Sequence, residues 1–480
     1  MRIITDVTAV TVDERRRIIT GGAIAIDGER IAAIDRTEVL RARYLDAEIV
    51  DGQGMVAIPG LIDTHAHADQ SLLRGLGDAM HWHPFLDRII GPYLAEREPA
   101  DGVLANMLSM IEMIRGGTTC FVSPNADPRD DYGALSEAVA DIGIRAVFCR
   151  FIMAKEDDTS AVAAKQVVAD AVEVMERWHG AAGGRLSMWF GLDVPRRPGD
   201  RVYPAFYKEV ADESRRIGVG ISYHFCSEIE DSTYIQNTYG MRPAEWSRDH
   251  HALGSNVLLI NGCWLTPLEM RILADTGTHL AHSPVANMKM ATGILPLPDV
   301  LAAGVNVALG TDGALNNNTH DMFGEMKSAC LLQNAVRRSA SAMTAATALE
   351  MATIGGARAI GRAHELGSLE PGKLADIVLI DPNHAHTLPA HDILSNLVFA
   401  AGPRNVDTVI IGGRIVLRNG RLPDLNEAAI FQRARNRAEA IRVQLGLTSP
   451  QEWPVVADRA AFVSGQTRPL DRTPADSANG

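Results

Sequence analysis

Cysteine is scarce in this 480-residue chain, and neither a long apolar run nor an excess of basic residues is present. Five widely separated cysteines, with no Cys-x-x-Cys pair, favour free thiols in a reducing compartment. No apolar run approaches the ~20 residues that span a bilayer, and the first residues lack the apolar core of a secretory signal. The net charge of −13 disfavours nucleic acid or an anionic membrane as the main partner. We therefore expect a soluble cytoplasmic protein. The cysteines are Cys120, Cys149, Cys226, Cys263 and Cys330.

Both ends of the chain are rich in short strands. Residues 23–31 alternate apolar and polar positions around Asp27-Gly28, which predicts a hairpin. The same pattern returns in residues 376–380 and 409–416. We predict a small β-sandwich formed by both termini, from residues 1–58 and 365–425. After it we expect a C-terminal helical unit over 426–464, with a charged amphipathic helix at 427–445, and a disordered tail over 465–480.

The middle of the chain, residues 59–364, alternates apolar strands with helical segments. Eight such units in about 300 residues predict an α/β fold, a (β/α)8 TIM barrel. Barrels of this kind place their chemistry at the carboxyl ends of the strands. The first strand candidate begins at Leu61, and the others are residues 118–122, 145–151, 187–192, 219–225, 257–261, 279–282 and 305–310.

Four potential metal ligands follow these strands. His65 and His67, two residues apart on a strand, would face the same side. His224 ends the fifth strand candidate and Asp312 follows the eighth. Singly, Asp312 is equally typical of a turn or helix N-cap and His224 of a satisfied strand end. Together, three imidazoles and one carboxylate suit Zn²⁺ or a similar divalent ion with a position left open for water.

Several motifs taken together resemble the amidohydrolase superfamily, in the branch of cytosine, guanine and adenosine-type deaminases and triazine hydrolases. The resemblance covers about residues 1–440. It rests on Pro59–His67, Gly117-Thr118-Thr119, His282–Lys289, Gly310-Thr311-Asp312 and Gly367–Val378.

The resemblance implies that His65, His67, His224 and Asp312 hold the metal. Since no lysine ends the strand at residues 187–192, the bridging lysine of two-metal relatives is absent, and we expect one divalent ion, zinc or alternatively iron, cobalt or manganese. It also implies a small-molecule substrate and a homo-oligomer.

Two positions depart from the family pattern. Deaminases of this branch carry a glutamate three residues after the fifth-strand histidine, whereas here Ser227 occupies that place and Glu228 follows it. They also carry a histidine at the end of the sixth strand, where this chain has Asn261. A shift of one residue along a strand turns a side chain to the other face, unless a bulge restores it.

These departures remove the group that would protonate a ring nitrogen, because a serine hydroxyl is too weak an acid. They resemble phenylurea and thiocarbamate hydrolases. We therefore predict a mononuclear metal-dependent hydrolase that cleaves an acyclic C–N or C–S acyl bond, as in a urea, carbamate, thiocarbamate or amide. Asp312 would take the proton from the metal-activated water, and Asn261 would steady the oxyanion or bind the metal weakly. A strand-end Asn261 bonded to backbone is the alternative.

Two other functions are kept open. One is an aminohydrolase or dechlorinase acting on a heteroaromatic ring, with Glu228 or His282 as the acid. The other is a catalytically silent relative that serves as a binding or scaffold protein, which metal analysis would identify.

Further candidates for the substrate pocket surround the motifs. Gln70 lies just past the histidine pair, and the loop containing Trp82 and His83 is rich in aromatic and imidazole groups that could stack on an aryl substrate. Trp264 follows Asn261 closely, and Glu228 completes the set. A surface loop anchored by Trp82 is the alternative for that segment, and His282 could instead order its own turn.

Overall fold

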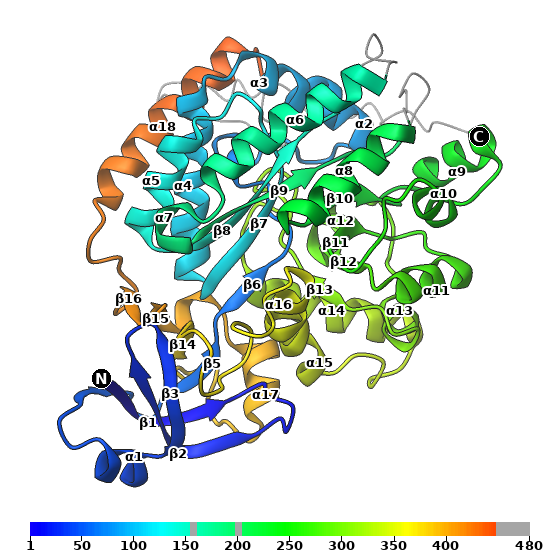
Figure 1. The fold of residues 1–480 in the computed structure, drawn as a ribbon. Helices are drawn as coiled ribbons and strands as arrows, with labels where there is room; N and C mark the ends of the chain where they lie inside the picture. The colour runs from blue at the N-terminus through cyan, green and yellow to red at the C-terminus, as the bar shows by residue number, and fades with distance from the viewer. Residues whose placement is uncertain (154–160, 197–203, 448–480) are drawn as a thin grey trace, which may run out of the picture.

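A computed structural model describes residues 1–153, 161–196 and 204–447 of the chain. Within them, eight parallel strands form a barrel in which each strand pairs with its sequence neighbour (Figure 1). The backbone N–H of Thr64 donates to the carbonyl of Leu309 at 3.0 Å, which brings the first and last strands together. The fold is the predicted (β/α)8 barrel. Its strands are β6 (Leu61–Asp63), β7 (Thr118–Ala126), β8 (Arg145–Phe151), β9 (Leu186–Gly191), β10 (Ile221–Phe225), β11 (Val257–Asn261), β12 (His279–His282) and β13 (Val307–Leu309).

Helices cover the outside of the barrel, so its strands are buried almost throughout. This explains why the strands are nearly continuous apolar runs, such as Val257–Asn261, and show no alternation. The longer helices are α4 (Pro99–Arg115), α5 (Tyr132–Ile142), α6 (Ala161–Trp178), α8 (Pro204–Ile217), α9 (Ile229–Tyr239), α11 (Pro267–Thr276) and α14 (Met322–Arg337). Shorter ones are α2 (Trp82–Phe85), α3 (Gly91–Glu96), α7 (Ala181–Gly184), α10 (Pro243–Asp249), α12 (Pro284–Met290), α13 (Leu297–Ala302), α15 (Ala345–Glu350) and α16 (Gly356–Ala359).

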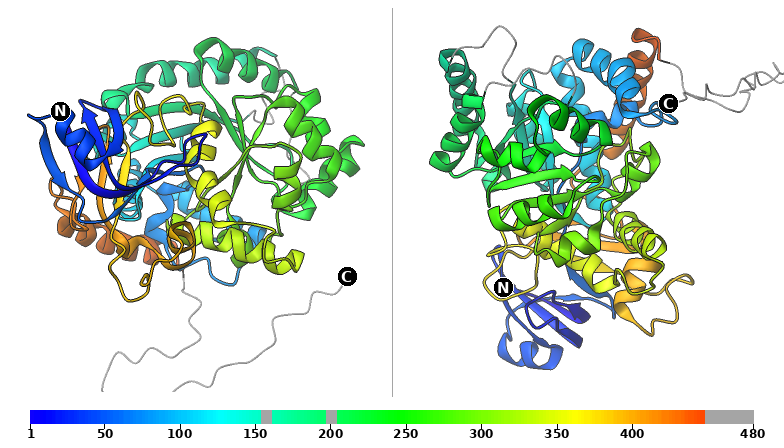
Figure 2. Two further views of the ribbon diagram at one scale, coloured as in Figure 1. Left: turned by 90° about the horizontal axis from the view of Figure 1, so that it is seen from below. Right: turned by 90° about the vertical axis from the view of Figure 1, so that its right-hand side faces the viewer.

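A second eight-stranded sheet combines both ends of the chain, as the sequence predicted. It is mixed, with the order β16-β15-β14-β5-β1-β2-β3, and β4 pairs with β1. Figure 2 shows this domain beside one end of the barrel. Its strands are β1 (Arg2–Val10), β2 (Ile18–Asp27), β3 (Arg30–Arg36), β4 (Glu48–Asp51), β5 (Val56–Pro59), β14 (Ile377–Ile380), β15 (Val406–Ile411) and β16 (Arg414–Leu417), and its helices are α1 (Thr37–Arg43) and α17 (Ile393–Ser395).

The two domains meet at a short and well-buried junction. Strand β5 ends at Pro59 and β6 begins two residues later, so the chain passes directly from the terminal sheet into the barrel. Arg145 on β8 forms two hydrogen bonds with the carboxylate of Asp376, at 2.7 and 3.0 Å, and both side chains are buried. A bidentate pair of this kind fixes orientation as well as distance. The junction therefore holds the first metal-ligand motif in a defined position.

The C-terminal helix α18 (Glu427–Gln444) packs along α4. Arg437 binds Asp101 and Arg115 binds Glu427 across this contact. The remainder of the predicted helical unit, from residue 448, and the predicted disordered tail over 465–480 lie outside the described residues. Among the helices that are described, none combines the length and the apolar character needed to cross a membrane. All five cysteines are free and buried.

Candidate metal centre

The first histidine pair lies just beyond its strand. Strand β6 ends at Asp63, and His65 and His67 occupy an irregular segment before the 3-10 helix η1 (Ala68–Leu73), so their expected placement on the strand itself is wrong. The segment remains bonded on both sides, because Ala66 donates to the carbonyl of Val122 and Asp312 donates to that of His65. These hydrogen bonds hold the imidazole rings of His65 and His67 toward one point, although the segment that carries them is not a strand.

The three histidines converge at the mouth of the barrel. Ligand-capable atoms of His65, His67 and His224 all lie within 4.8 Å of one another, and all three residues are buried. Nε2 of His67 and Nε2 of His224 are 3.3 Å apart. Two nitrogens bound at about 2.1 Å to a tetrahedral ion are separated by roughly that distance. Both ring nitrogens of His65 are buried without a hydrogen-bond partner, so these residues fit a divalent metal ion.

Asp312 completes the set. Its Oδ1 lies 3.3 Å from Nε2 of His65 and 3.6 Å from Nε2 of His67. The same oxygen accepts hydrogen bonds from the backbone N–H of Gly313 at 2.7 Å and from Nδ2 of Asn316 at 3.0 Å. No hydrogen bond from the described residues reaches Oδ2. One oxygen is thus fixed, and the other is available to water or substrate.

Two glycines allow the strands to approach so closely. A Cβ on Gly310 would lie 2.6 Å from Cβ of His65, and one on Gly313 would lie 2.6 Å from Oε1 of Gln70. Asp312 itself has a φ of +61°, in the left-handed region. Aspartate is among the few residues that enter this region readily. The Gly310-Thr311-Asp312-Gly313 turn is therefore shaped by backbone requirements as well as by chemistry.

Burial favours the neutral form of His67 and His224. Burial, with the nearby His65, lowers the pKa of His67 to about 3. Burial, with Arg196, lowers the pKa of His224 well below its usual value. Burial alone would raise the pKa of Asp312, but His65 and His67 bring it down to about 2. His67, His224 and Asp312 therefore have the protonation states that zinc requires.

His282 and Asn261 lie at the ends of neighbouring strands of the same barrel. His282 is fully buried, burial lowers its pKa to about 3, and neither ring nitrogen has a partner. The amide of Asn261 is engaged at both ends: Nδ2 donates to Oγ of Ser227 and Oδ1 accepts from Nδ2 of Asn287, each at 2.9 Å. The ring nitrogens of His282 are thus free to bind a ligand, whereas the amide of Asn261 is already used in a chain of hydrogen bonds.

The segment predicted to be an aromatic loop near the pocket forms the short helix α2, and Trp82 on it lies beside the metal centre. The Trp82 ring lies 6.1 Å from the ring of His224, centre to centre, and stacks at 5.8 Å on the buried Phe85. Glu228 has only 8% of its surface exposed, and its Oε1 has no partner. Burial and Asp231 raise the pKa of Glu228, whereas His83 and His81 oppose that shift. Glu228 is therefore buried close to the segment that contains His81, Trp82 and His83.

The other two pocket candidates, Gln70 and Trp264, differ in burial and in whether their polar atoms are already bonded. Gln70 is buried against the Asp312 turn with Oε1 unpaired. Trp264 is 38% exposed, and its Nε1 donates to the carbonyl of Thr292, so its polar atom is already used. Sequence reasoning missed Arg196, a buried residue bonded to Asp193 that affects the pKa of His224. A single arginine in a loop after β9 gives no pattern by which to find it.

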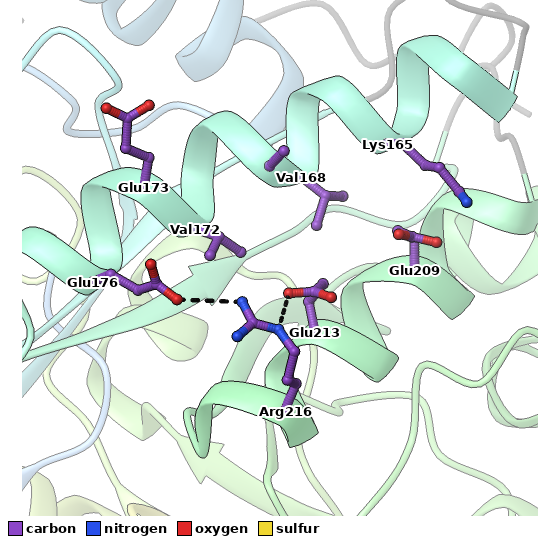
Figure 3. Close-up of a pocket in the computed structure, with 9 residues that line it drawn as sticks. Lys165, Val168, Val172, Glu173, Glu176, Glu209, Glu213 and Arg216 are labelled. Carbon is purple, nitrogen blue, oxygen red and sulfur yellow. Dashed lines mark hydrogen bonds and ion pairs between the residues drawn. The ribbon is translucent and has the colours of Figure 1, made fainter.

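A surface cavity of about 390 Å³ lies elsewhere, between α6 and α8 on the outer face of the barrel (Figure 3). Arg216 there binds Glu176 at 3.3 Å and Glu213 at 2.7 Å. Val168 and Val172 line its floor, and none of the histidines contributes. This cavity is therefore separate from the metal centre.

Residues 56–416 match the sequence profile described as the amidohydrolase family. The chain belongs to the amidohydrolase family. It is 35% identical over 420 residues to a 5-methylthioadenosine/S-adenosylhomocysteine deaminase of Desulforudis audaxviator, a match that covers 88% of this chain and 95% of that one. It is 30% identical to a 5'-deoxyadenosine deaminase of Methanosarcina mazei, covering 92% and 98%.

A solved structure agrees with these relatives. An adenosine deaminase from Xanthomonas campestris, crystallised with bound zinc, has a TM-score of 0.85 and 29% identity, and the match covers 92% of this chain and 98% of that one. As predicted, this amidohydrolase is therefore a hydrolase acting on non-peptide C–N bonds, in the deaminase branch, with a site suited to a divalent metal.

The comparisons contradict the expected hydrolysis of an acyclic urea, carbamate, thiocarbamate or amide, because these relatives are named as deaminases of adenosine-type compounds. They favour the heteroaromatic alternative. The physical reason for the error lies at the end of β10. Cys226 has a φ of +47°, so the chain leaves the regular strand before Ser227, and the assumption that Glu228 faces away does not hold.

Proposed function

We propose that this amidohydrolase is a zinc-dependent deaminase that removes an exocyclic amino group from a purine-type heteroaromatic ring, as in an adenine nucleoside. The observation that carries the proposal is the left-handed Cys226, after which the carboxyl group of Glu228 is buried with Oε1 unpaired, near His83 and His81. Because the chain leaves β10 at Phe225 and turns at Cys226, the extra position before Glu228 does not place it on the opposite face of a strand. The relatives named as adenosine-type deaminases support the same substrate class.

His65, His67, His224 and Asp312 would hold the ion. A bound divalent ion lowers the pKa of a coordinated water toward about 7 and so supplies a nucleophile at neutral pH. Asp312 is ionised, since its pKa is about 2, and its Oδ2 accepts one of the two protons of the attacking water. It then delivers this proton to the leaving amino group, which departs as ammonia.

Glu228 manages the second proton. In its ionised form it takes this proton from water and passes it to the ring nitrogen next to the carbon under attack. Its raised pKa lets it retain the proton long enough to protonate a weakly basic nitrogen. Water thereby supplies both protons, and the C–NH₂ group of the ring becomes a carbonyl beside a protonated ring nitrogen. Trp82 would stack on the substrate, and Gln70 would accept a hydrogen bond from it.

The test is a substrate panel with the zinc-loaded, full-length enzyme. We expect ammonia release from adenosine, 5′-deoxyadenosine or 5′-methylthioadenosine, and none from an aryl urea. Glu228→Gln should lower kcat by about 10²- to 10⁴-fold, the range for loss of a general acid–base group.

Glu137→Gln is the matched control, because Glu137 is an exposed acid on helix α5 and does not affect the pKa of Glu228. It should keep kcat within about twofold, the expectation for a surface change away from the chemistry. A protein with stoichiometric zinc that releases no ammonia from any ring substrate would contradict the proposal, as would a fully active Glu228→Gln.

The proposal extends to assembly and location. The family resemblance supports a homo-oligomer, which light scattering of the purified protein measures directly. The five free, buried cysteines support a reducing compartment, the cytoplasm. Metal analysis of protein purified without added metal tests zinc against iron, cobalt and manganese.

A further inference from the structure

A chain of buried hydrogen bonds links three loops at the barrel mouth. Asn287 on α12 donates from Nδ2 to Oδ1 of Asn261, and Nδ2 of Asn261 donates to Oγ of Ser227. Asn287 also donates to Oγ1 of Thr292 at 3.2 Å. All four residues are less than a tenth exposed. Since buried polar groups are costly when unpaired, this chain defines the position of each member.

The backbone at this point is unusual on both adjacent strands. Phe225 of β10 pairs with Asn261 of β11, and Gly262 donates to the carbonyl of Phe225 at 2.8 Å. Directly after this pair, Cys226 has a φ of +47°, and Asn261 itself has a φ of +80°. Asparagine enters the left-handed region readily, whereas cysteine does so rarely. Surrounding contacts must therefore hold Cys226 in this conformation.

Two contacts perform that task. On one side, the amide of Asn261 binds the hydroxyl of Ser227. On the other, Oδ2 of Asp231 accepts the backbone N–H groups of Ser227 and Glu228, at 3.0 and 3.2 Å. The residue before Glu228 is thus held by its side chain and its backbone at once, which fixes the direction in which the Glu228 carboxyl group leaves the chain.

We propose that Asn261 is a positioning residue whose amide holds Ser227 and thereby fixes the left-handed turn at Cys226 that presents Glu228. The two departures from the family pattern, in strands five and six, are then one coupled change. An asparagine at position 261 supplies the N–H donor that the extra residue, Ser227, needs. The catalytic consequence rests on the proposed role of Glu228, whereas the hydrogen-bonded support does not.

The proposal separates Asn261 from the chemistry. As an oxyanion donor or metal ligand it would act on substrate or ion directly, so its loss would alter KM or zinc retention. As a positioning residue it acts on the geometry of Glu228 alone. A displacement of about 1 Å at a reacting group can cost roughly 10²-fold in rate. Loss of Asn261 should therefore lower kcat and leave KM and zinc content unchanged.

The experiment compares Asn261→Gly, Ser227→Ala and the double variant in the zinc-loaded, full-length enzyme. Glycine removes the amide and tolerates the φ of +80° at this position. Each single change removes the same hydrogen bond, so each should lower kcat by about 10- to 100-fold. The double variant should be no slower than the slower single one, because both act through one contact. Independent, multiplying losses, or a change in zinc content or KM, would overturn the proposal.

Asn256→Ala is the matched control. Asn256 precedes the same strand β11 at the opposite end of the barrel, and its Nδ2 donates to Oγ of Ser214 at 2.7 Å. The substitution removes the same type of hydrogen bond far from the mouth. It should lower stability without lowering kcat more than about twofold.

A second readout does not require turnover. Hydrogen–deuterium exchange over residues 225–232 should accelerate in Asn261→Gly and stay unchanged in Asn256→Ala. If no ring substrate is turned over, the proposed function fails, but faster exchange still supports the hydrogen-bonded link from Asn261 to Ser227. Unchanged exchange in Asn261→Gly would overturn that link even in an active deaminase.

Discussion

The two sides of the barrel mouth are built in different ways. On the side of β6 and β13, a continuous buried network supports the metal ligands. Oγ1 of Thr311 donates to Asp63 at 2.6 Å and contacts Nδ1 of His320 at 2.9 Å, and Nε2 of His320 lies 3.1 Å from Oγ of Ser109. Asp63 also accepts the backbone N–H groups of His65 and Thr311. None of these residues is more than 1% exposed.

The side of β10 and β11 is supported by fewer contacts. Its supports are the amide of Asn261, the left-handed residues Cys226 and Asn261, and the cap at the start of α9. His224 is the one proposed metal ligand on this side, and Glu228 follows it in the chain. In the proposed mechanism the metal ligands and the base Asp312 share the first support, whereas Glu228 has a separate one. Damage to the first side should therefore appear in metal affinity as well as in kcat, and damage to the second in kcat alone.

The largest effect is expected from Asp312→Asn on the first side. The amide keeps the shape but can neither take a proton nor bind the ion as an anion. We expect kcat to fall by at least about 10³-fold, since both metal and base chemistry are affected. The melting temperature should stay close to that of the wild type, and Asp299→Asn, at an exposed position, is the control. A near-normal rate in Asp312→Asn would remove Asp312 from its role.

His320→Leu tests the network behind the ligands. Loss of both ring contacts should loosen the Asp63–Thr311 connection and reduce zinc affinity by about 10- to 100-fold, the range for residues that orient metal ligands. Competition with a chelator measures this directly. His279→Leu is the control, because His279 lies at the start of β12, at the far end of the barrel. Unchanged zinc affinity in His320→Leu would show that the two sides do not differ in this way.

The two tryptophans near the mouth should respond unequally. Trp82 lies beside the ring of His224, and its loss removes a stacking surface for the substrate ring, so Trp82→Ala should raise KM by about fivefold, equivalent to the roughly 1 kcal/mol of an aromatic contact. Trp264→Ala should change KM by less than about twofold, because its indole N–H already donates to the carbonyl of Thr292 and the side chain is partly exposed. Equal changes in KM would place both side chains against the substrate.

The smallest effect is a shift in pH dependence. His83 and His81 lower the pKa of Glu228, while burial, Asp231 and Glu230 raise it. Glu228 must be ionised to accept its proton, so kcat/KM should fall as pH drops through its raised pKa. His83→Gln removes one opposing charge and should move this acid limb to higher pH by less than about one unit. A shift to lower pH, or no acid limb, would contradict the role of Glu228.

Periodicity and strand-end chemistry were sufficient to predict the barrel, the terminal sheet and the convergence of three histidines. The feature that misled the functional prediction was the backbone conformation of a single residue, Cys226. Nothing in Phe225-Cys226-Ser227 signals a left-handed residue, since neither glycine nor asparagine marks the turn. Strand periodicity therefore predicts the wrong face for Glu228, and the substrate class predicted from it was wrong. His320 escaped notice because its partners, Asp63 and Ser109, are far away in sequence and only the folded barrel brings them together.

The pairing of β5 with β14 has a consequence for biosynthesis. Strand β5 ends at Pro59, and its antiparallel partner begins at Ile377, more than 300 residues later. At about 5–20 residues per second, the ribosome takes at least roughly 15 s to deliver that partner. Throughout this interval the nascent chain presents an apolar strand edge to the cell, a known risk for aggregation. Truncation before β14 would make that exposure permanent, so a shortened, freestanding barrel should be recovered from insoluble material.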